Sequence, residues 1–294
     1  MDRVSPRAAQ VGDEERSPAR SSERDVDGPA RRRDVAVDGV RLETATLAGD
    51  PARAAIVLLH EGLGSVSLWR DVPQRLRART GRTVVAYSRR GYGGSDPLDA
   101  KREPSFMHVE ATRVLPALLR ELRLERPIVF GHSDGASIAL LFAGAFPDAL
   151  SGLILEAPHV FVEDLSVRSI ETARRAYETT DLRAKLARHH ADVDGAFYGW
   201  NDVWLDPRFR DWNIEDAASA VRVPLLLIQG ENDEYGTLAQ IDAIAARAPQ
   251  ADILVVSGAG HSPHRDDPDL IVERVGDFVD RLGPSSGGAR EAVV

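Results

Sequence analysis

Short apolar runs alternate along the chain with longer segments of helical spacing. Six runs have the length of a strand and are apolar at most positions, as is typical of parallel strands covered on both faces. They are residues 54–60 (AAIVLLH), 82–88 (RTVVAYS), 127–132 (PIVFGH), 150–157 (LSGLILEA), 223–230 (VPLLLIQG) and 251–258 (ADILVVSG). Between them, segments such as 109–122 and 238–248 carry apolar residues at helical spacing.

A hairpin precedes this alternation. Residues 34–39 and 40–49 have the composition of two strands joined at Asp38-Gly39. A hairpin followed by strand–helix units predicts an α/β fold with a doubly wound, mostly parallel sheet. We expect residues 34–158 and 222–283 to form this core.

Residues 159–221 interrupt the alternation. They contain no clear strand, have helical character and carry three of the four tryptophans. A region this long is not expected to be a structureless loop in a compact domain. It is interpreted as a helical cap inserted over one edge of the sheet.

The two ends of the chain differ in composition from the rest. Residues 1–33 mix both signs of charge with Ser, Pro and Gly and lack aromatics, so we expect a disordered extension that includes a solvated Arg31–Arg33 flank. Residues 284–294 predict a flexible tail for similar reasons. The N-terminus lacks the apolar run of a signal peptide, and we expect a cytoplasmic protein.

Composition narrows the classes of function. The net charge of −9 argues against a general nucleic-acid or anionic-membrane partner, and no run of 18 apolar residues suggests a membrane span. The chain has no cysteine, which excludes disulfides, thiolate catalysis and cysteine–metal sites. A small-molecule substrate is the expected partner, and the oligomeric state cannot be read from the residues.

One pentapeptide carries candidate chemistry. Residues 131–135, Gly-His-Ser-Asp-Gly, fit the pattern G-x-S-x-G, which is weak evidence by itself. Its context is more specific, because it ends the predicted strand 127–132 and opens the apolar helix ASIALLFAGAF. This is the setting of a nucleophile elbow, in which Ser133 stands above the sheet and glycines at 131 and 135 allow close backbone packing.

The two neighbours of Ser133 are not its catalytic partners. Adjacent side chains diverge in a tight turn, so His132 and Asp134 cannot align with the serine hydroxyl. We expect the backbone N–H of Asp134 to form half of an oxyanion hole. The Asp134 side chain either lines the pocket or caps the helix, and the second interpretation is favoured because aspartate is common at helix starts.

The acid and the histidine are expected downstream, in the order serine, acid, histidine. Asp233 follows the strand 223–230 and His261 follows the strand 251–258, at the strand ends where parallel sheets place ligand chemistry. Asp233 would orient His261, which would accept the proton of Ser133.

These assignments have rivals. Other candidate acids are Glu156, Glu231 and Glu234, and the other candidate histidine is His264. Register after the strand favours Asp233, and His264 lies beyond Pro263 toward the next helix. No cluster of histidines and carboxylates has the spacing of a metal site, so no metal is expected.

Two further segments complete a resemblance. With the elbow, the stretches LLHEGLGSVSLW (58–69) and YSRRGYGGSD (87–96) resemble the α/β-hydrolase superfamily over residues 34–283. The family usually has His-Gly at the start of the first loop, whereas Glu61 follows His60 here. In this register Gly62 supplies the second oxyanion N–H. The resemblance implies a covered site and an acyl-enzyme route without a cofactor.

The resemblance also narrows the reaction. Dehalogenases and epoxide hydrolases carry aspartate at the position of Ser133, and hydrolases of meta-cleavage products commonly carry tryptophan at that of Ser262. The sequence looks more like carboxylesterases and enol-lactonases, which implies a serine hydrolase of small carboxylic esters, lactones or thioesters. The alternatives are a cofactor-free haloperoxidase or oxygenase, a C–C bond hydrolase on the same fold, and a slow-turnover ligand receptor.

The loop carboxylate raises a question about the pocket. A free Glu61 beside the oxyanion hole would oppose negative charge on the substrate. The favoured interpretation is that it points outward and pairs with an arginine such as Arg89 or Arg90. Aromatic residues of the predicted cap are candidates for the apolar wall of a pocket for neutral substrates: Phe197, Tyr198, Trp200 and Trp204.

Overall fold

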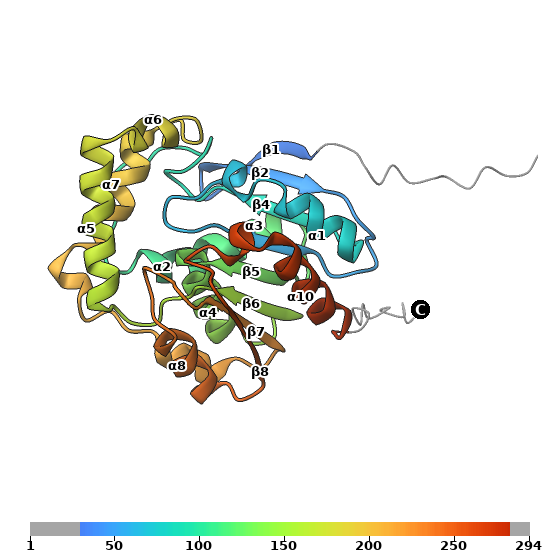
Figure 1. Ribbon diagram of the computed structural model, residues 1–294. Helices are drawn as coiled ribbons and strands as arrows, with labels where there is room; N and C mark the ends of the chain where they lie inside the picture. The colour runs from blue at the N-terminus through green and yellow to red at the C-terminus, as the bar shows by residue number, and fades with distance from the viewer. Residues whose placement is uncertain (1–29, 283–294) are drawn as a thin grey trace, which may run out of the picture.

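An eight-stranded sheet forms the centre of the computed structural model, which describes residues 30–282 (Figure 1). The strand order is β1-β2-β4-β3-β5-β6-β7-β8; β1–β2 and β2–β4 are antiparallel, and all other pairs are parallel. The predicted α/β fold class is thereby confirmed. The strands are β1 (Arg31–Val37), β2 (Val40–Leu47), β3 (Ile56–Leu59), β4 (Val84–Tyr87), β5 (Ile128–His132), β6 (Gly152–Glu156), β7 (Leu225–Gly230) and β8 (Ala251–Val256).

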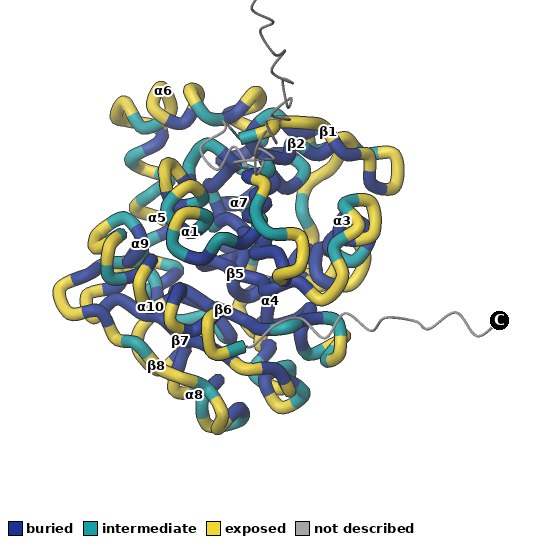
Figure 2. Tube along the Cα trace, turned by 90° about the vertical axis from the view of Figure 1, so that its right-hand side faces the viewer, coloured by how far each residue is buried: buried dark blue, intermediate teal, exposed yellow. Residues whose placement is uncertain are grey.

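Helices cover both faces of the sheet. Alternate strand residues enter two apolar clusters: Ile56 and Leu58 pack toward α1 and α10, whereas Val57 and Leu59 pack toward α3, α4 and α8. Figure 2 shows the buried strands between these more exposed layers. The helices of the core are η1 (Val66–Trp69), α1 (Val72–Thr80), α2 (Phe106–Val109), η2 (Glu110–Val114), α3 (Leu115–Glu121), α4 (Asp134–Ala145), α8 (Ala239–Arg247), α9 (Pro263–Asp266) and α10 (Pro268–Asp280).

The last strand differs from the other five apolar runs. Strands β3 to β7 are buried at every position, as expected for parallel strands covered on both faces. In β8, by contrast, Ile253 and Val255 are 45% and 43% exposed. This strand is at the edge of the sheet, where a neighbouring strand is present on one side alone.

The N-terminal boundary predicted at residue 34 is wrong for three residues. Arg31, Arg32 and Arg33 belong to β1 and pair with Thr46, Ala45 and Thr44 of β2. Their side chains are exposed, so composition suggested a disordered flank, whereas the backbone hydrogen bonds of the ladder order them. Ala30, also in the predicted extension, is described and packs partly buried against one of the apolar clusters. Residues 1–29 of the predicted extension, and the predicted tail, 284–294, lie outside the described residues.

The region predicted as a cap, residues 159–221, is helical and lies between β6 and β7. Its α-helices α5, α6 and α7 lie beside one end of the sheet (Figure 1). His190 joins this region to the core, because its Nδ1 accepts a hydrogen bond from the N–H of Gly93 and its Nε2 donates to the carbonyl of Leu63. Its elements are α5 (Asp164–Thr179), α6 (Leu182–Leu186), α7 (Val193–Trp204), η3 (Pro207–Phe209) and η4 (Glu215–Ala220).

Within residues 30–282, none of the helices combines the length and the apolar character that crossing a membrane requires.

Candidate active site

Ser133 occupies a sharp turn between β5 and α4. Its φ of 53° and ψ of −120° place a non-glycine residue in a strained conformation. The helix can begin so close to the sheet because of two glycines: a Cβ on Gly131 would lie 2.3 Å from the carbonyl oxygen of Gly135, and a Cβ on Gly135 would lie 2.1 Å from that of Leu59. The strand–turn–helix context expected of a nucleophile elbow is therefore present.

The structure brings Ser133, His261 and Asp233 into one hydrogen-bonded chain. The Oγ of Ser133 is 2.8 Å from Nε2 of His261, and Nδ1 of His261 is 2.9 Å from both carboxylate oxygens of Asp233. Asp233 follows β7 and His261 follows β8, at the carboxyl ends of these strands. An N–H on Nδ1 can donate to Asp233, which leaves Nε2 free to accept the proton of the serine hydroxyl.

Neighbouring groups keep the Asp233 carboxylate ionised. Its Oδ1 also accepts the backbone N–H groups of Tyr235 and Gly236, and its Oδ2 accepts the amide of Gln229 at 2.6 Å. Burial alone would raise the pKa of Asp233, but the hydrogen bonds from His261 and from the N–H of Tyr235, together with the charge of the imidazolium, outweigh it and lower that pKa. Burial alone would lower the pKa of His261, but the hydrogen bond to Asp233 and the negative charges of Asp233, Glu234 and Glu61 together raise it above the ordinary value.

The rivals of Asp233 and His261 have other partners. His264 donates its backbone N–H and Nδ1–H to the two oxygens of Glu156, each at 2.7 Å. Glu231 accepts hydrogen bonds from Ser257 and Gly258, and Glu234 accepts the backbone N–H of His261 at 3.1 Å. Among these acids, Asp233 alone bonds the ring of His261 in the described structure.

His132 contacts the backbone of His261. Its Nε2 is 2.7 Å from the carbonyl oxygen of His261 and can donate to it, so the loop that carries His261 is fixed to the end of β5. The ligand atoms of His132, Glu156 and His264 also lie within 4.8 Å of one another, a proximity that the sequence spacing did not reveal. Because both oxygens of Glu156 already accept hydrogen bonds from His264, these contacts explain why the three side chains lie together.

The loop after β3 presents a free backbone donor beside Ser133. Within the described chain, the N–H groups of Gly62 and Asp134 donate to no backbone or side-chain acceptor, and both residues line the same cavity. Arg89, fully buried, donates to the carbonyls of His60 and Glu61 and so fixes the shape of this loop. Two unpaired N–H groups at one cavity are the donors that an oxyanion hole requires, and their role stays a prediction.

The favoured interpretation of the Asp134 side chain is wrong. Its carboxylate does not cap α4; Oδ1 accepts the indole N–H of Trp204 at 3.0 Å, and the side chain lines the cavity. Ser133 is the residue at the capping position, one place earlier than composition suggested. Asp134 begins the helix itself, and its side chain turns toward the helical region above.

The Glu61 carboxylate is paired, but neither outward-facing nor bound by the side chains proposed from sequence. Oε1 contacts Arg265 Nη2 at 2.6 Å, and the side chain lines the cavity. Burial would raise the pKa of Glu61, yet Arg265 and His132 hold it well below its usual range. Arg89 binds the backbone of the loop, and Arg90 pairs with Asp99 instead.

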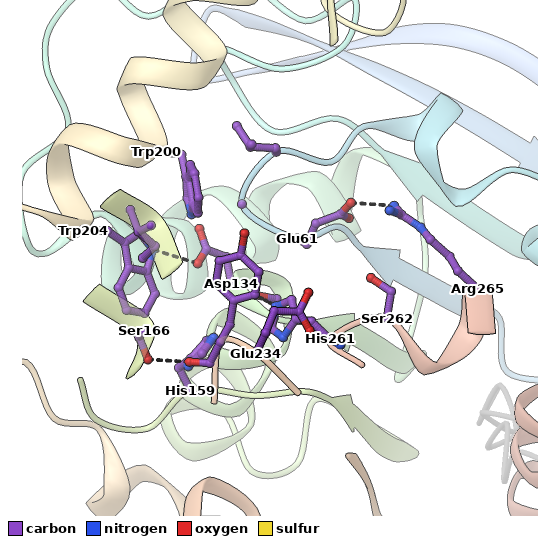
Figure 3. Close-up of a pocket in the computed structure, with 15 residues that line it drawn as sticks. Glu61, Asp134, His159, Ser166, Trp200, Trp204, Glu234, His261, Ser262 and Arg265 are labelled. Atoms are coloured by element: carbon purple, nitrogen blue, oxygen red, sulfur yellow. Dashed lines mark hydrogen bonds and ion pairs between the residues drawn. The ribbon is translucent and has the colours of Figure 1, made fainter. Parts of the chain in front are cut away.

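Ser133 lines a cavity of ≈ 240 Å³. Figure 3 shows this cavity and its labelled side chains. Trp200 and Trp204 line it as predicted. Phe197 and Tyr198 do not: Phe197 is fully buried and stacks on Tyr177 at 3.7 Å, and Tyr198 borders a separate hollow on the other side of α7. The lining residues are Glu61, Gly62, Leu63, Ser133, Asp134, His159, Ser166, Ile170, Trp200, Trp204, Glu234, Tyr235, His261, Ser262 and Arg265.

Several of these residues were not identified from the sequence. His159 comes from the segment after β6, and burial lowers its pKa to about 3, so its ring is neutral at pH 7. Tyr235 and Arg265 each follow a predicted site residue within four positions, and that proximity was the available signal. Ser166 and Ile170 are on α5, whose apolar face gives no sequence indication of whether it meets a pocket or a core.

Comparisons with known proteins agree with this architecture. The sequence model of the Alpha/beta hydrolase family matches residues 56–274. The chain is 24% identical to an sn-1-specific diacylglycerol lipase of Mus musculus, ABHD11, covering 79% of this chain and 83% of that protein. It is 28% identical to the serine hydrolase BPHL of Homo sapiens, covering 68% and 69%.

Solved structures show the same fold. The enol-lactonase of Burkholderia xenovorans LB400 superposes with a TM-score of 0.66 at 21% identity, covering 84% of this chain and 100% of the other. At this identity the likeness speaks for the fold, and the family match spans most of the described residues. The protein therefore belongs to the alpha/beta hydrolase family.

Proposed function

We propose that the protein is a serine hydrolase that cleaves a small carboxylic ester, lactone or thioester through an acyl-enzyme. The chain of hydrogen bonds from Ser133 through His261 to Asp233, open to the cavity, is the observation that carries this proposal. The cavity volume of ≈ 240 Å³ favours a small substrate over a long acyl chain.

In the first half-reaction the Oγ of Ser133 attacks the substrate carbonyl carbon while Nε2 of His261 accepts its proton. Negative charge then develops on the carbonyl oxygen, and the N–H groups of Gly62 and Asp134 bind it. Collapse of the tetrahedral intermediate breaks the bond to the leaving group, which takes the proton from His261. The acyl group remains on Ser133.

Water completes the cycle. His261 removes a proton from a water molecule, whose oxygen attacks the acyl carbon, and the proton returns to Ser133 Oγ as the free acid forms. Asp233 stabilises the imidazolium in both halves and stays ionised, in agreement with its lowered pKa. A slow ligand receptor would share the first half-reaction, so turnover distinguishes the two.

The substrate test uses a panel of 4-nitrophenyl esters, with each rate divided by the spontaneous hydrolysis rate of that ester. We expect a neutral short-chain ester to exceed an isosteric ester with a carboxylate near the scissile bond by about tenfold or more in kcat/KM. An electrostatic penalty of roughly 1.4 kcal/mol on binding the anionic transition state suffices for a tenfold difference. Asp134 and Glu234 border the cavity, and its arginine, Arg265, is already bonded to Glu61.

Preference for the anionic ester would mean that Arg265 binds the substrate carboxylate, and this description of the pocket would be wrong. Absence of steady-state turnover of any ester, with a single stoichiometric release of 4-nitrophenol, would instead identify a receptor. Measurements at fixed ionic strength keep screening the same across the panel.

The pH dependence follows from the raised pKa of His261. Since the general base must be neutral, kcat/KM falls as the pH drops through that pKa, and we expect the midpoint above the ordinary histidine value of 6.5. Asp233→Asn removes the charge that raises the pKa and should move the midpoint downward in the residual activity. A parent midpoint well below 6.5 would contradict the proposed coupling between His261 and Asp233.

A further inference from the structure

The Asp134 carboxylate is buried at the wall of the cavity with one oxygen unpaired. The residue is 1% exposed, and Oδ1 accepts the indole N–H of Trp204 at 3.0 Å. Its Oδ2 has no hydrogen-bond partner in the described structure, and the nearest cation, Nη2 of Arg89, is 3.9 Å away. Buried carboxylate oxygens are normally bonded, so an unpaired one at the wall of a pocket suggests a position for a ligand donor.

Aromatic rings line the same cavity as this carboxylate. They include Trp200, Trp204 and the neutral ring of His159 (Figure 3). Tyr235 also lines the cavity. Trp200 packs against the oxyanion loop, since a Cβ on Gly62 would lie 2.2 Å from its Nε1. Indole and phenol faces attract cations and repel anions, which adds to the effect of the carboxylate.

The charges around the cavity also favour a cation. Its lining contains the carboxylates of Glu61, Asp134 and Glu234 and a single guanidinium, that of Arg265. Arg265 is bonded to Glu61 at 2.6 Å, so the other two carboxylates have no positive partner in the lining.

The arginine behind Asp134 does not replace a ligand. Arg89 is fully buried, and its two terminal nitrogens donate to the carbonyls of the oxyanion loop. Burial raises the pKa of the Asp134 carboxyl despite the charge of Arg89, so the negative charge there is incompletely balanced. A bound cation would stabilise the ionised form.

We propose that the substrate is an ester whose acyl group carries an ammonium group close to the scissile carbonyl, bound between Oδ2 of Asp134 and the indole of Trp200. Asp134 directly follows Ser133, and in the proposed mechanism its own N–H binds the carbonyl oxygen, so its side chain starts close to the acyl carbon. The inference deepens the proposed ester hydrolysis and rests on it.

The test compares two substrates of the same shape, the 4-nitrophenyl esters of 3-aminopropanoate and butanoate, in which an ammonium group replaces a methyl group. Each kcat/KM is divided by the spontaneous hydrolysis rate of the same ester at the same pH. For the parent protein we expect a normalised preference for the amino ester on the order of 100-fold, as charge-assisted hydrogen bonds in buried sites provide.

Asp134→Asn is expected to bring this ratio to within about threefold of unity. The amide keeps the shape of the carboxylate and can still accept the N–H of Trp204. Any damage to the oxyanion hole would slow both esters alike, so it cancels in the ratio of the two kcat/KM values. Glu234→Gln is the matched control: it removes one carboxylate from the exposed mouth of the same cavity, so the ratio should fall by no more than about threefold because water screens that charge.

Each outcome has a distinct meaning. A parent ratio near unity, or an unchanged ratio in Asp134→Asn, would overturn the cation site and leave ester hydrolysis standing. If neither ester shows hydrolysis that depends on Ser133, the proposed function itself fails.

If Asp134→Asn does not fold, inhibition of the parent decides. Propylammonium should inhibit butanoate ester hydrolysis with a Ki at least about tenfold below that of 1-propanol, and equal or weaker inhibition would reject the site.

Discussion

Replacing Ser133 by alanine is expected to lower kcat/KM for a hydrolysed ester by about 10⁴-fold or more, with the fold unchanged. The Oγ of Ser133 is the atom that forms the bond to the acyl carbon. In the alanine variant a water molecule would have to attack instead, and no side chain holds it in the position of Oγ. Alanine retains the Cβ, so the backbone with φ of 53° experiences the same steric demands as in the parent. Initial rates of 4-nitrophenol release and the melting temperature measure the two effects separately.

Ser262 offers a matched control for this substitution. It is the residue after His261, lines the same cavity, and makes no side-chain capping hydrogen bond at the start of α9. Ser262→Ala should retain activity within about tenfold of the parent, since its hydroxyl does not react. If Ser133→Ala also stays within tenfold, Ser133 is not the nucleophile.

The second large effect is expected for Asp233→Asn, about 10⁴-fold in kcat. The amide cannot stabilise the imidazolium and favours the wrong tautomer of His261, because its NH₂ group donates where the carboxylate accepts. Steady-state kinetics on the best ester, with circular dichroism to verify folding, provide the measurement.

Glu156→Gln is the matched comparison for Asp233→Asn. Both residues are buried carboxylates bonded to a histidine that follows β8, but Glu156 binds His264, outside the Ser133 chain. We expect Glu156→Gln to reduce kcat far less and to lower the melting temperature more clearly, because a buried hydrogen-bonded pair is broken. The reverse ranking of kcat would transfer the acid role to Glu156.

Local pattern was sufficient to place the central residues of the site. Ser133, Asp233 and His261 each follow an apolar run within three residues, and a parallel sheet brings the carboxyl ends of such runs to one edge. The elbow was also visible locally, since Gly131 and Gly135 are required by backbone contacts within the same strand–turn–helix unit and with β3.

Contacts between distant segments could not be read in the same way. Glu61 pairs with Arg265, 204 residues away, and nothing in either local sequence distinguishes that partner from Arg89 or Arg90. Phe197 and Trp200 are on one face of α7 and look equivalent in sequence, yet Phe197 packs on Tyr177 of α5 while Trp200 reaches the cavity. The packing of α5 against α7 decides this.

Strand β1 illustrates a different limit. The residues Arg31 to Arg33 have the composition of a solvated flank and indeed have exposed side chains. Their order comes from backbone pairing with β2, which side-chain composition does not report.

The central claim, that Ser133 carries the acyl group during turnover, is tested most directly by acid-quenching the protein during ester hydrolysis and mapping its peptides by mass spectrometry. The account predicts that the peptide containing Ser133 gains the mass of the acyl group, that hydroxylamine removes it, and that Ser133→Ala shows no such adduct. An acyl adduct on another residue, or undiminished turnover in Ser133→Ala without any adduct, would contradict it.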